Sequence, residues 1–259
     1  MDLGIKGKRV LITGGSKGIG AAIAKDFSNE GAKVSIVSRN EERLKKEIDE
    51  LGGAIKGHEY IVSDLRDGGE PTRVAREMIV KHKKVDIVVH NVGGALGEKN
   101  PLGKVEDYNA VWQFNVGIAI EMNAVLVPEM KKQGWGRVVH VSSISAELGE
   151  PLVEPFGGAL PYAAAKAYLN AYIRGLGREM AKDNVVVTGV MPGAVLSEGK
   201  YWDKLKDENP QLVDEFLNQH YPIGRFADAE EISSFVVFLA SDEASFAAGS
   251  VVSVSGGRV

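Results

Sequence analysis

The chain has 259 residues, a formal net charge of −4 and no cysteine, with 44% hydrophobic and 25% charged residues. This composition predicts a globular protein and excludes disulfides, a cysteine nucleophile and Cys-ligated zinc. An acidic balance without a dense Lys/Arg cluster disfavours nucleic-acid binding, and no uninterrupted apolar run reaches the ~20 residues of a membrane span. The first residues lack the apolar segment of a signal peptide, so we expect a cytoplasmic protein.

Short apolar runs alternate with helical patterns along the whole chain. The expected strands are 10–13, 33–38, 58–62, 86–90, 136–141, 184–190 and 250–254. The expected helices are 19–27, 41–51, 72–82, 105–132, 162–181 and 229–240. Alternation with strands that are apolar on both sides predicts an α/β fold: a Rossmann-like, doubly wound parallel sheet with helices on both faces. No linker or repeat divides the chain, so we expect one domain over 1–259.

The first strand ends at a glycine cluster, Thr13-Gly14-Gly15-Ser16-Lys17-Gly18-Ile19-Gly20, and an apolar helical face follows. A strand–turn–helix of this kind directs backbone N–H groups and a helix dipole at one spot, which suits a phosphate. We expect Gly14 to make the turn, Gly18 to admit a pyrophosphate and Gly20 to let helix and strand pack closely. An ordinary glycine-rich βα turn is the alternative.

The residues after the second and third strands bear on which dinucleotide binds. Ser38 and Arg39 follow the second strand, Lys17 lies in the glycine turn, and the next carboxylate along the chain is Glu41. A basic pair without a competing acid favours NADP(H) over NAD(H), unless both are solvated surface charges. Asp64, after the third strand, is expected to accept a hydrogen bond from the adenine amine or to be a simple turn residue.

Tyr162 and Lys166 are the candidate acid–base pair. Four residues apart, they share one face of a helix. A free phenol titrates near pH ~10, and a neighbouring ammonium stabilises the phenolate and so lowers that pKa. Taken alone, such a pair also occurs by chance on exposed helices.

Together, the motifs resemble the short-chain dehydrogenase/reductase family, in its compact single-domain branch, along the whole chain. The matching pieces, in the family's order, are 13–20, Asp64-Leu65, 91–94, Asn115, Ser143, 162–166 and Pro192-Gly193. The resemblance implies a catalytic tetrad. Tyr162 exchanges a proton with the reacting oxygen, Ser143 hydrogen-bonds that oxygen, and Lys166 holds the nicotinamide ribose. Asn115 helps to hold a water that relays protons. Ser142 is the alternative candidate for the catalytic serine.

The cofactor contacts expected from the turns and the resemblance lie at the carboxyl ends of the strands. They are Gly14, Ser16, Lys17, Gly18, Ile19, Ser38, Arg39, Asp64, Leu65, Asn91, Gly93, Tyr162, Lys166, Pro192, Gly193, Val195 and Ser197. Val195 offers its backbone to the carboxamide, and Ser197 replaces the family's frequent threonine. No metal is expected, because the five histidines show no ligand spacing.

Three features depart from the family pattern. His90 stands where asparagine is frequent, and either caps its strand or touches the adenosine ribose region. The segment between Ser143 and Tyr162 is longer than usual and carries Glu147, Glu150 and Glu154. It either shapes substrate choice or is a tolerated surface loop. The stretch 197–221 resembles a helical lid.

These features predict an NADP(H)-dependent oxidoreductase that interconverts a ketone and a secondary alcohol. The acidic mouth favours a neutral polar or hydroxylated substrate over an anionic carrier-bound acyl chain, because like charges repel. Alternatives are a 3-oxoacyl thioester reductase, a non-catalytic NADP-binding sensor, and a dehydratase or epimerase that retains its cofactor. The family resemblance implies a homo-oligomer, a dimer or tetramer, through helices 105–132 and 162–181 and a second contact near 250–257.

Overall fold

The structure, a computed structural model, describes residues 1–98, 100–148, 159–196 and 201–258. Its centre is a seven-stranded sheet in the order β3-β2-β1-β4-β5-β6-β7, and every pairing is parallel. The strands are β1 (Arg9–Thr13), β2 (Lys33–Ser38), β3 (Glu59–Val62), β4 (Ile87–His90), β5 (Gly136–Val141), β6 (Val185–Pro192) and β7 (Val251–Val254). The predicted Rossmann-like parallel sheet is therefore confirmed. The strand order reverses between β1 and β4, which is where such sheets bind ligands.

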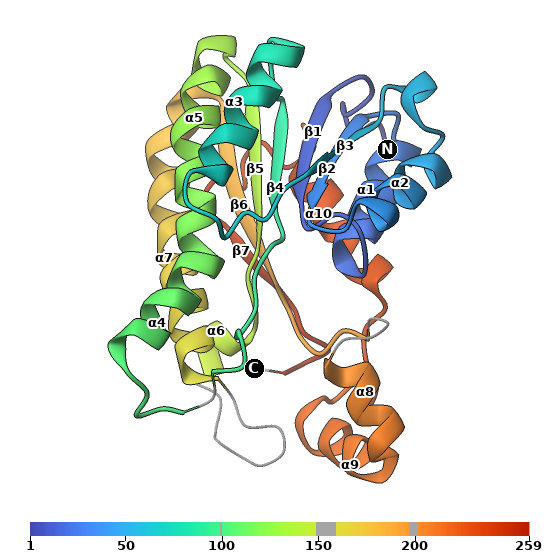
Figure 1. The fold of residues 1–259 in the computed structure, drawn as a ribbon, viewed down its shortest axis with the longest axis vertical. Coiled ribbons are helices and arrows are strands. Elements are labelled where there is room, and N and C mark those ends of the chain that lie inside the picture. Colours follow the sequence, from blue (N-terminus) through green and yellow to red (C-terminus); the bar gives the residue numbers. More distant parts are fainter. Residues whose placement is uncertain (99, 149–158, 197–200, 259) are drawn as a thin grey trace.

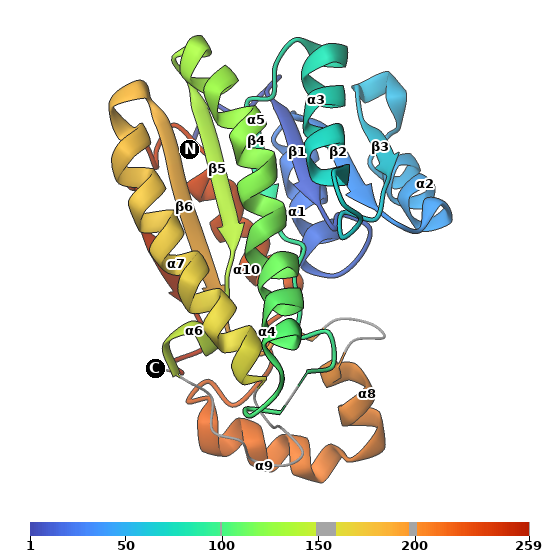
Figure 2. The same ribbon diagram turned by 60° about the vertical axis from the view of Figure 1, so that its left-hand side comes forward.

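Helices cover both faces of the sheet (Figures 1 and 2). On one face lie α1 (Ile19–Asn29), α2 (Glu41–Glu50) and α10 (Ala229–Leu239). On the other lie α3 (Glu70–His82), α4 (Val105–Trp112), α5 (Ile118–Gln133) and α7 (Leu160–Met180). Shorter pieces are η1 (Ala54–Lys56), α6 (Ser145–Leu148) and η3 (Ala181–Asp183).

Two apolar cores explain why the strands are hydrophobic on both sides. Val10 and Ile12 of β1 point into the core under α1 and α10, whereas Leu11 points into the core under α3 and α5. All three are fully buried. Successive side chains of a strand face opposite sides, so a central strand must supply apolar groups to both layers.

The long helix predicted over 105–132 runs from Val105 to Gln133 but contains a π-helical turn, η2 (Gln113–Gly117). Among the described residues this is the one helix long and apolar enough to cross a membrane by length and composition alone. Core helices pass the same test, and 56% of its most apolar window is buried inside the molecule. We therefore take it as a core helix.

The segment predicted as a lid forms α8 (Tyr201–Glu208) and α9 (Pro210–His220), which lie together beyond the carboxyl end of the sheet (Figure 1). Residues 197–200 of that segment lie outside the described residues. A third apolar cluster holds the two helices. Within it, the Trp202 ring stacks on Phe216 with 5.1 Å between centroids. The aromatic residues at helical spacing thus mainly form a small core.

Candidate active site

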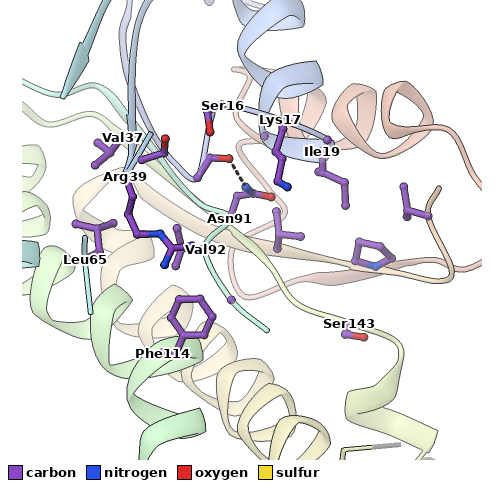
Figure 3. Close-up of a pocket in the computed structure, with 18 of the residues that line it drawn as sticks. Ser16, Lys17, Ile19, Val37, Arg39, Leu65, Asn91, Val92, Phe114 and Ser143 are labelled. Carbon is purple, nitrogen blue, oxygen red and sulfur yellow. Dashed lines mark hydrogen bonds between the residues drawn. The ribbon is translucent and has the colours of Figure 1, made fainter. Parts of the chain in front are cut away.

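A cavity of about 480 Å³ lies at the carboxyl ends of the central strands (Figure 3). Its volume is within the usual range for small-molecule sites. Sixteen of the predicted cofactor contacts line it, together with the predicted catalytic serine: Gly14, Ser16, Lys17, Gly18, Ile19, Ser38, Arg39, Asp64, Leu65, Asn91, Gly93, Ser143, Tyr162, Lys166, Pro192, Gly193 and Val195. The predicted contact Ser197 lies outside the described residues.

The glycine turn between β1 and α1 has the shape of a phosphate cradle. Gly14 and Gly18 have φ angles of 70° and 57°, in the region that side chains disfavour. A Cβ on Gly20 would lie 2.2 Å from the Gly14 carbonyl oxygen, so this close contact needs glycine. Asn91 Nδ2 donates to the carbonyls of Thr13 and Gly14, at 3.1 and 3.2 Å. The end of β4 therefore holds the turn in place.

Tyr162 and Lys166 come from the first turns of α7 and both line the cavity. Lys166 is almost fully buried, and its Nζ donates to the Val141 carbonyl of β5 at 2.9 Å. The same Nζ lies 5.6 Å from the centre of the Tyr162 ring. Burial lowers the pKa of Lys166 to about 7. A buried lysine with a lowered pKa in a cleft is typical of functional sites.

The two serines after β5 differ in what their hydroxyls bind. Ser142 is buried, and its Oγ donates to Asn170 Oδ1 at 2.6 Å. Ser143 is partly exposed; its Oγ donates to the Ser145 hydroxyl and accepts from the Ser145 N–H, both at 3.2 Å. Ser143 is the better candidate to meet a substrate, since Ser142 is already engaged with a buried partner.

Asn115 lies in the π-helical turn, behind the cavity wall. Its Oδ1 accepts from the Gly94 N–H at 3.0 Å, and its Nδ2 donates to the carbonyls of Gly94 and Val111, both at 2.8 Å. A Cβ on Gly93 would come within 2.6 Å of Asn115 Oδ1 and 3.1 Å of Lys166 Nζ. The asparagine therefore adjoins the lysine, but its side chain holds the β4 turn. The predicted water relay stays a prediction.

The other end of the cavity is strongly basic. Lys17, Arg39, Arg43 and Arg66 line it, and Asp64 is the one carboxylate among the described lining residues. The prediction that no acid competes with Arg39 holds along the chain but is wrong in space, because Asp64 Oδ2 lies 3.7 Å from Arg39 Nη1. The turn after β3 brings the Asp64 carboxylate next to the end of β2, where Arg39 lies.

The Asp64 carboxylate, which we expected either to accept a hydrogen bond from the adenine amine or to be a simple turn residue, is held by Arg66 in this structure. Arg66 Nη2 donates to Asp64 Oδ2 at 2.6 Å, and Nε donates to Oδ1 at 3.0 Å. Hydrogen bonds from Arg66 lower the pKa of Asp64 to about 2. Asp64 is thus ionised and paired at neutral pH.

His90, for which we expected a strand cap or a ribose contact, does neither. Its buried ring stacks on His140 of β5, with centroids 4.7 Å apart, and Nε2 donates to Asn123 Oδ1 of α5 at 2.8 Å. It points into the core between the sheet and α5, away from the cavity. The strand alternation decides this, since Val88 two residues earlier faces the same core.

The acidic mouth expected from the long segment after Ser143 is not supported by the part that the structure describes. Glu147 of α6 lies 4.0 Å from Arg174, far along α7 from Tyr162, and does not line the cavity. Glu150 and Glu154 fall outside the described residues. Substrate selection by these carboxylates therefore has no observed basis.

Several cavity residues were not predicted from the sequence. They are Val37, Asn40, Arg43, Ser63, Arg66, Phe114 and Val141. Val37, Ser63 and Val141 stand at or next to strand ends, a position that could have identified them. Phe114 comes from a helix and carries no comparable signal. Trp202, which also lines the cavity, belongs to the stretch predicted as a lid. Among the described residues no group of three His, Asp or Glu side chains could hold a metal ion.

Comparison with known proteins covers almost the whole chain. A family model described as enoyl-(acyl carrier protein) reductase matches residues 14–258. The 3-oxoacyl-(acyl-carrier-protein) reductase FabG of Thermotoga maritima is 33% identical over 258 residues, covering 98% of this chain and 99% of that protein. The 7alpha-hydroxysteroid dehydrogenase of Escherichia coli K12 is 30% identical, covering 100% and 96%.

Solved structures give the same result. L-sorbose reductase from Gluconobacter frateurii, complexed with NADPH and L-sorbose, matches with a TM-score of 0.89 and 32% identity, covering 100% of this chain and 98% of that one. A 7alpha-hydroxysteroid dehydrogenase complexed with NADH matches with a TM-score of 0.85 and 30% identity, covering 100% and 96%. On its motifs, its fold and these relatives, the chain belongs to the short-chain dehydrogenase/reductase family, as an oxidoreductase acting on CH–OH and C=O groups.

Proposed function

We propose that this protein is an NADP(H)-dependent oxidoreductase that interconverts a ketone and a secondary alcohol, with Tyr162 as the general acid and base. The observation that carries the proposal is one cavity with Tyr162, Lys166 and Ser143 among its walls and a glycine turn and basic cluster elsewhere around it. The catalytic side chains suit the nicotinamide end of NADP(H), and the basic cluster suits the end that carries the 2′-phosphate. The glycine turn, in which Gly14 and Gly18 have positive φ angles, fits the pyrophosphate.

Each catalytic side chain has a distinct task in this proposal. The bound cofactor supplies or accepts the hydride. In reduction, Tyr162 donates its phenolic proton to the carbonyl oxygen, and in oxidation the phenolate takes the proton from the alcohol. Ser143 donates a hydrogen bond to the same oxygen and stabilises the charge that develops there. Lys166, in its charged form, favours the phenolate, and its buried position fixes its Nζ beside the tyrosine ring.

NADP(H) is the proposed cofactor because four cations and one paired carboxylate line the basic end. A 2′-phosphate adds negative charge there, whereas a 2′-hydroxyl gains nothing from it. The NADPH complex of the sorbose reductase supports this choice. The NADH complex of the hydroxysteroid dehydrogenase makes NAD(H) the alternative.

For the substrate we propose a small polar or hydroxylated carbonyl compound. The support is the L-sorbose reductase, which matches over the whole chain. A 3-oxoacyl thioester is the second candidate, favoured by the FabG relative at 33% identity. We further propose that the protein is a single-domain homo-oligomer of the cytoplasm, without nucleic-acid or membrane partners.

Turnover with a panel of carbonyl compounds tests the reaction. A ketose, a 3-oxoacyl thioester and a ketosteroid are each offered with NADPH or NADH while the absorbance of the reduced nicotinamide is followed. We expect oxidation of NADPH with the ketose. Tight NADPH binding without turnover of any compound indicates the sensor, and product formation without net cofactor oxidation indicates a dehydratase or epimerase.

The variant Tyr162→Phe tests the acid–base group. Removing the phenolic proton should lower kcat by about 10²–10⁴-fold, the usual contribution of a general acid. NADPH binding, measured by protein fluorescence, should stay nearly unchanged. Tyr168→Phe is the matched control, because Tyr168 lies on the same helix, is half exposed and does not line the cavity. Unchanged kcat in Tyr162→Phe would remove the tyrosine from the mechanism.

A further inference from the structure

We propose that Arg66 is a specificity-determining residue that neutralises Asp64 and thereby leaves Arg39 available to a 2′-phosphate. The inference rests on the proposed NADP(H) function and explains how the basic end of the cavity works despite a carboxylate in its wall. Arg66 acts here as a positioning and charge-masking residue rather than as a direct ligand of the cofactor.

The contacts around Asp64 are unequal. Arg66 makes four of them. Its Nη2 lies 2.6 Å from Oδ2, its Nε 3.2 Å from Oδ2 and 3.0 Å from Oδ1, and its backbone N–H donates to Oδ1 at 3.1 Å. Arg39 reaches the same Oδ2 only at 3.7 Å, beyond hydrogen-bond distance. The forked guanidinium of Arg66 thus engages both carboxylate oxygens, the stronger geometry of such pairs.

The local backbone holds Arg66 in this position. After β3 the chain makes a turn in which the Asp67 N–H donates to the Asp64 carbonyl at 3.0 Å. Leu65, between the two charged residues, is buried in the core under α3. Its burial anchors the turn, so that Asp64 and Arg66 both stay at the cavity wall.

Without Arg66, the nearest cation to Asp64 among those that line the cavity is Arg39, at 3.7 Å. The carboxylate would then pair with the guanidinium that is needed for the 2′-phosphate, and its own charge would repel that phosphate. Figure 3 shows the Arg39 and Lys17 side chains both extending downward from the upper part of the view, with Arg39 to the left of Lys17. The binding of a nucleotide that carries a 5′-phosphate but no 2′-phosphate should depend far less on this competition for Arg39.

The test measures binding without turnover, by calorimetric titration with 2′,5′-ADP and with 5′-AMP. In Arg66→Gln we expect the Kd of 2′,5′-ADP to rise by about five- to tenfold, as for loss of a favourable charge at a partly exposed site, and the Kd of 5′-AMP to change little. Arg73→Gln is the matched control. Arg73 has similar exposure and also pairs with carboxylates, Glu70 and Glu77, but does not line the cavity.

The double variant Asp64→Asn/Arg66→Gln separates masking from direct contact. It removes one negative and one positive charge, so the net charge of the cavity is that of the wild type. Masking predicts that the ratio of the Kd of 2′,5′-ADP to the Kd of 5′-AMP returns to within about twofold of the wild-type ratio. The ratio is used because both ligands carry adenine, so a changed adenine contact at position 64 affects both Kd values. A double variant with the same ratio as Arg66→Gln shows that Arg66 binds the phosphate itself and overturns the inference.

Two further outcomes are distinguishable. Wild-type protein that binds 2′,5′-ADP no better than 5′-AMP contradicts the proposed NADP(H) preference, and the inference fails with it. Wild-type protein that prefers 2′,5′-ADP, with an equal preference in Arg66→Gln, leaves the proposed function intact and overturns the role of Arg66 alone.

Discussion

At the scale of single residues, burial sets the charge of the groups behind the cavity. Burial lowers the pKa of His90 to about 4, and burial together with His90 and Lys166 lowers the pKa of His140 well below its usual value. Both rings are therefore neutral at pH 7. A neutral histidine pair keeps a further positive charge away from Lys166, whose own pKa burial already lowers.

The histidine pair predicts a loss of stability in mild acid. His90 has a lowered pKa in the folded state, so the unfolded chain binds more protons between about pH 6.5 and 4, and stability falls as the pH falls through this window. His90 alone should cost about 2 kcal/mol between pH 7 and 5. Urea unfolding at both pH values should show a smaller loss in His90→Asn than in the wild type. Equal losses would contradict the shifted histidine.

At the scale of elements, the βα unit at the start of the chain depends on a backbone contact, while α7 depends on its buried face. Gly20, in the first turn of α1, packs directly against the Gly14 carbonyl, where any Cβ would collide. Gly175 lies exposed in α7 and a Cβ there would meet nothing within 4 Å. The same substitution therefore has opposite effects at the two positions.

We expect Gly20→Ala to destabilise the protein by about 1–3 kcal/mol, the usual cost of overpacking. It should also reduce the rise in melting temperature caused by NADP, because the phosphate cradle is displaced. Gly175→Ala should stabilise by about 0.5–1 kcal/mol, through the lower backbone entropy of alanine, and keep the NADP response. Urea unfolding and thermal melts with and without NADP measure both. A tolerated Gly20→Ala would show that the turn does not need its glycine.

At the scale of the whole molecule, large apolar side chains remain exposed on several helices and outside them. Tyr168 on α7 is 49% exposed, Phe235 and Phe238 on α10 are each 42% exposed, and Phe246 is fully exposed. Exposed apolar groups of this size on helix faces are typical of association surfaces. They agree with the homo-oligomer that we propose.

Light scattering after gel filtration tests the association. We expect a mass of two or four times 27.8 kDa for the wild type. Tyr168→Glu should lower that mass, because a carboxylate in an apolar interface is desolvated without a partner. Val80→Glu is the matched control and should leave the mass unchanged, because Val80 lies on α3, outside the two helices 105–132 and 162–181 of the expected contact. A wild-type mass of 27.8 kDa would contradict the oligomer, and circular dichroism checks that each variant is folded.

Much of the fold and of the candidate site follows from local patterns in the sequence. Three patterns carried the prediction: the alternation of apolar strands with helices, the glycine spacing at 14–20 and the Tyr162–Lys166 spacing. Each involves residues close together in the chain, so local backbone geometry and side-chain chemistry are enough to predict the structure that it forms. Strand ends predict lining residues because the carboxyl ends of parallel strands meet at one edge of the sheet.

Other features were decided only by the tertiary structure. The approach of Asp64 to Arg39, the burial of His90 against His140, and the pairing of Glu147 with Arg174 depend on which way each side chain points after the elements pack. By itself the sequence determined which chemical groups are present and on which elements they lie. Their partners and charges were decided by distances between residues far apart in the chain, because electrostatics and burial depend on those distances.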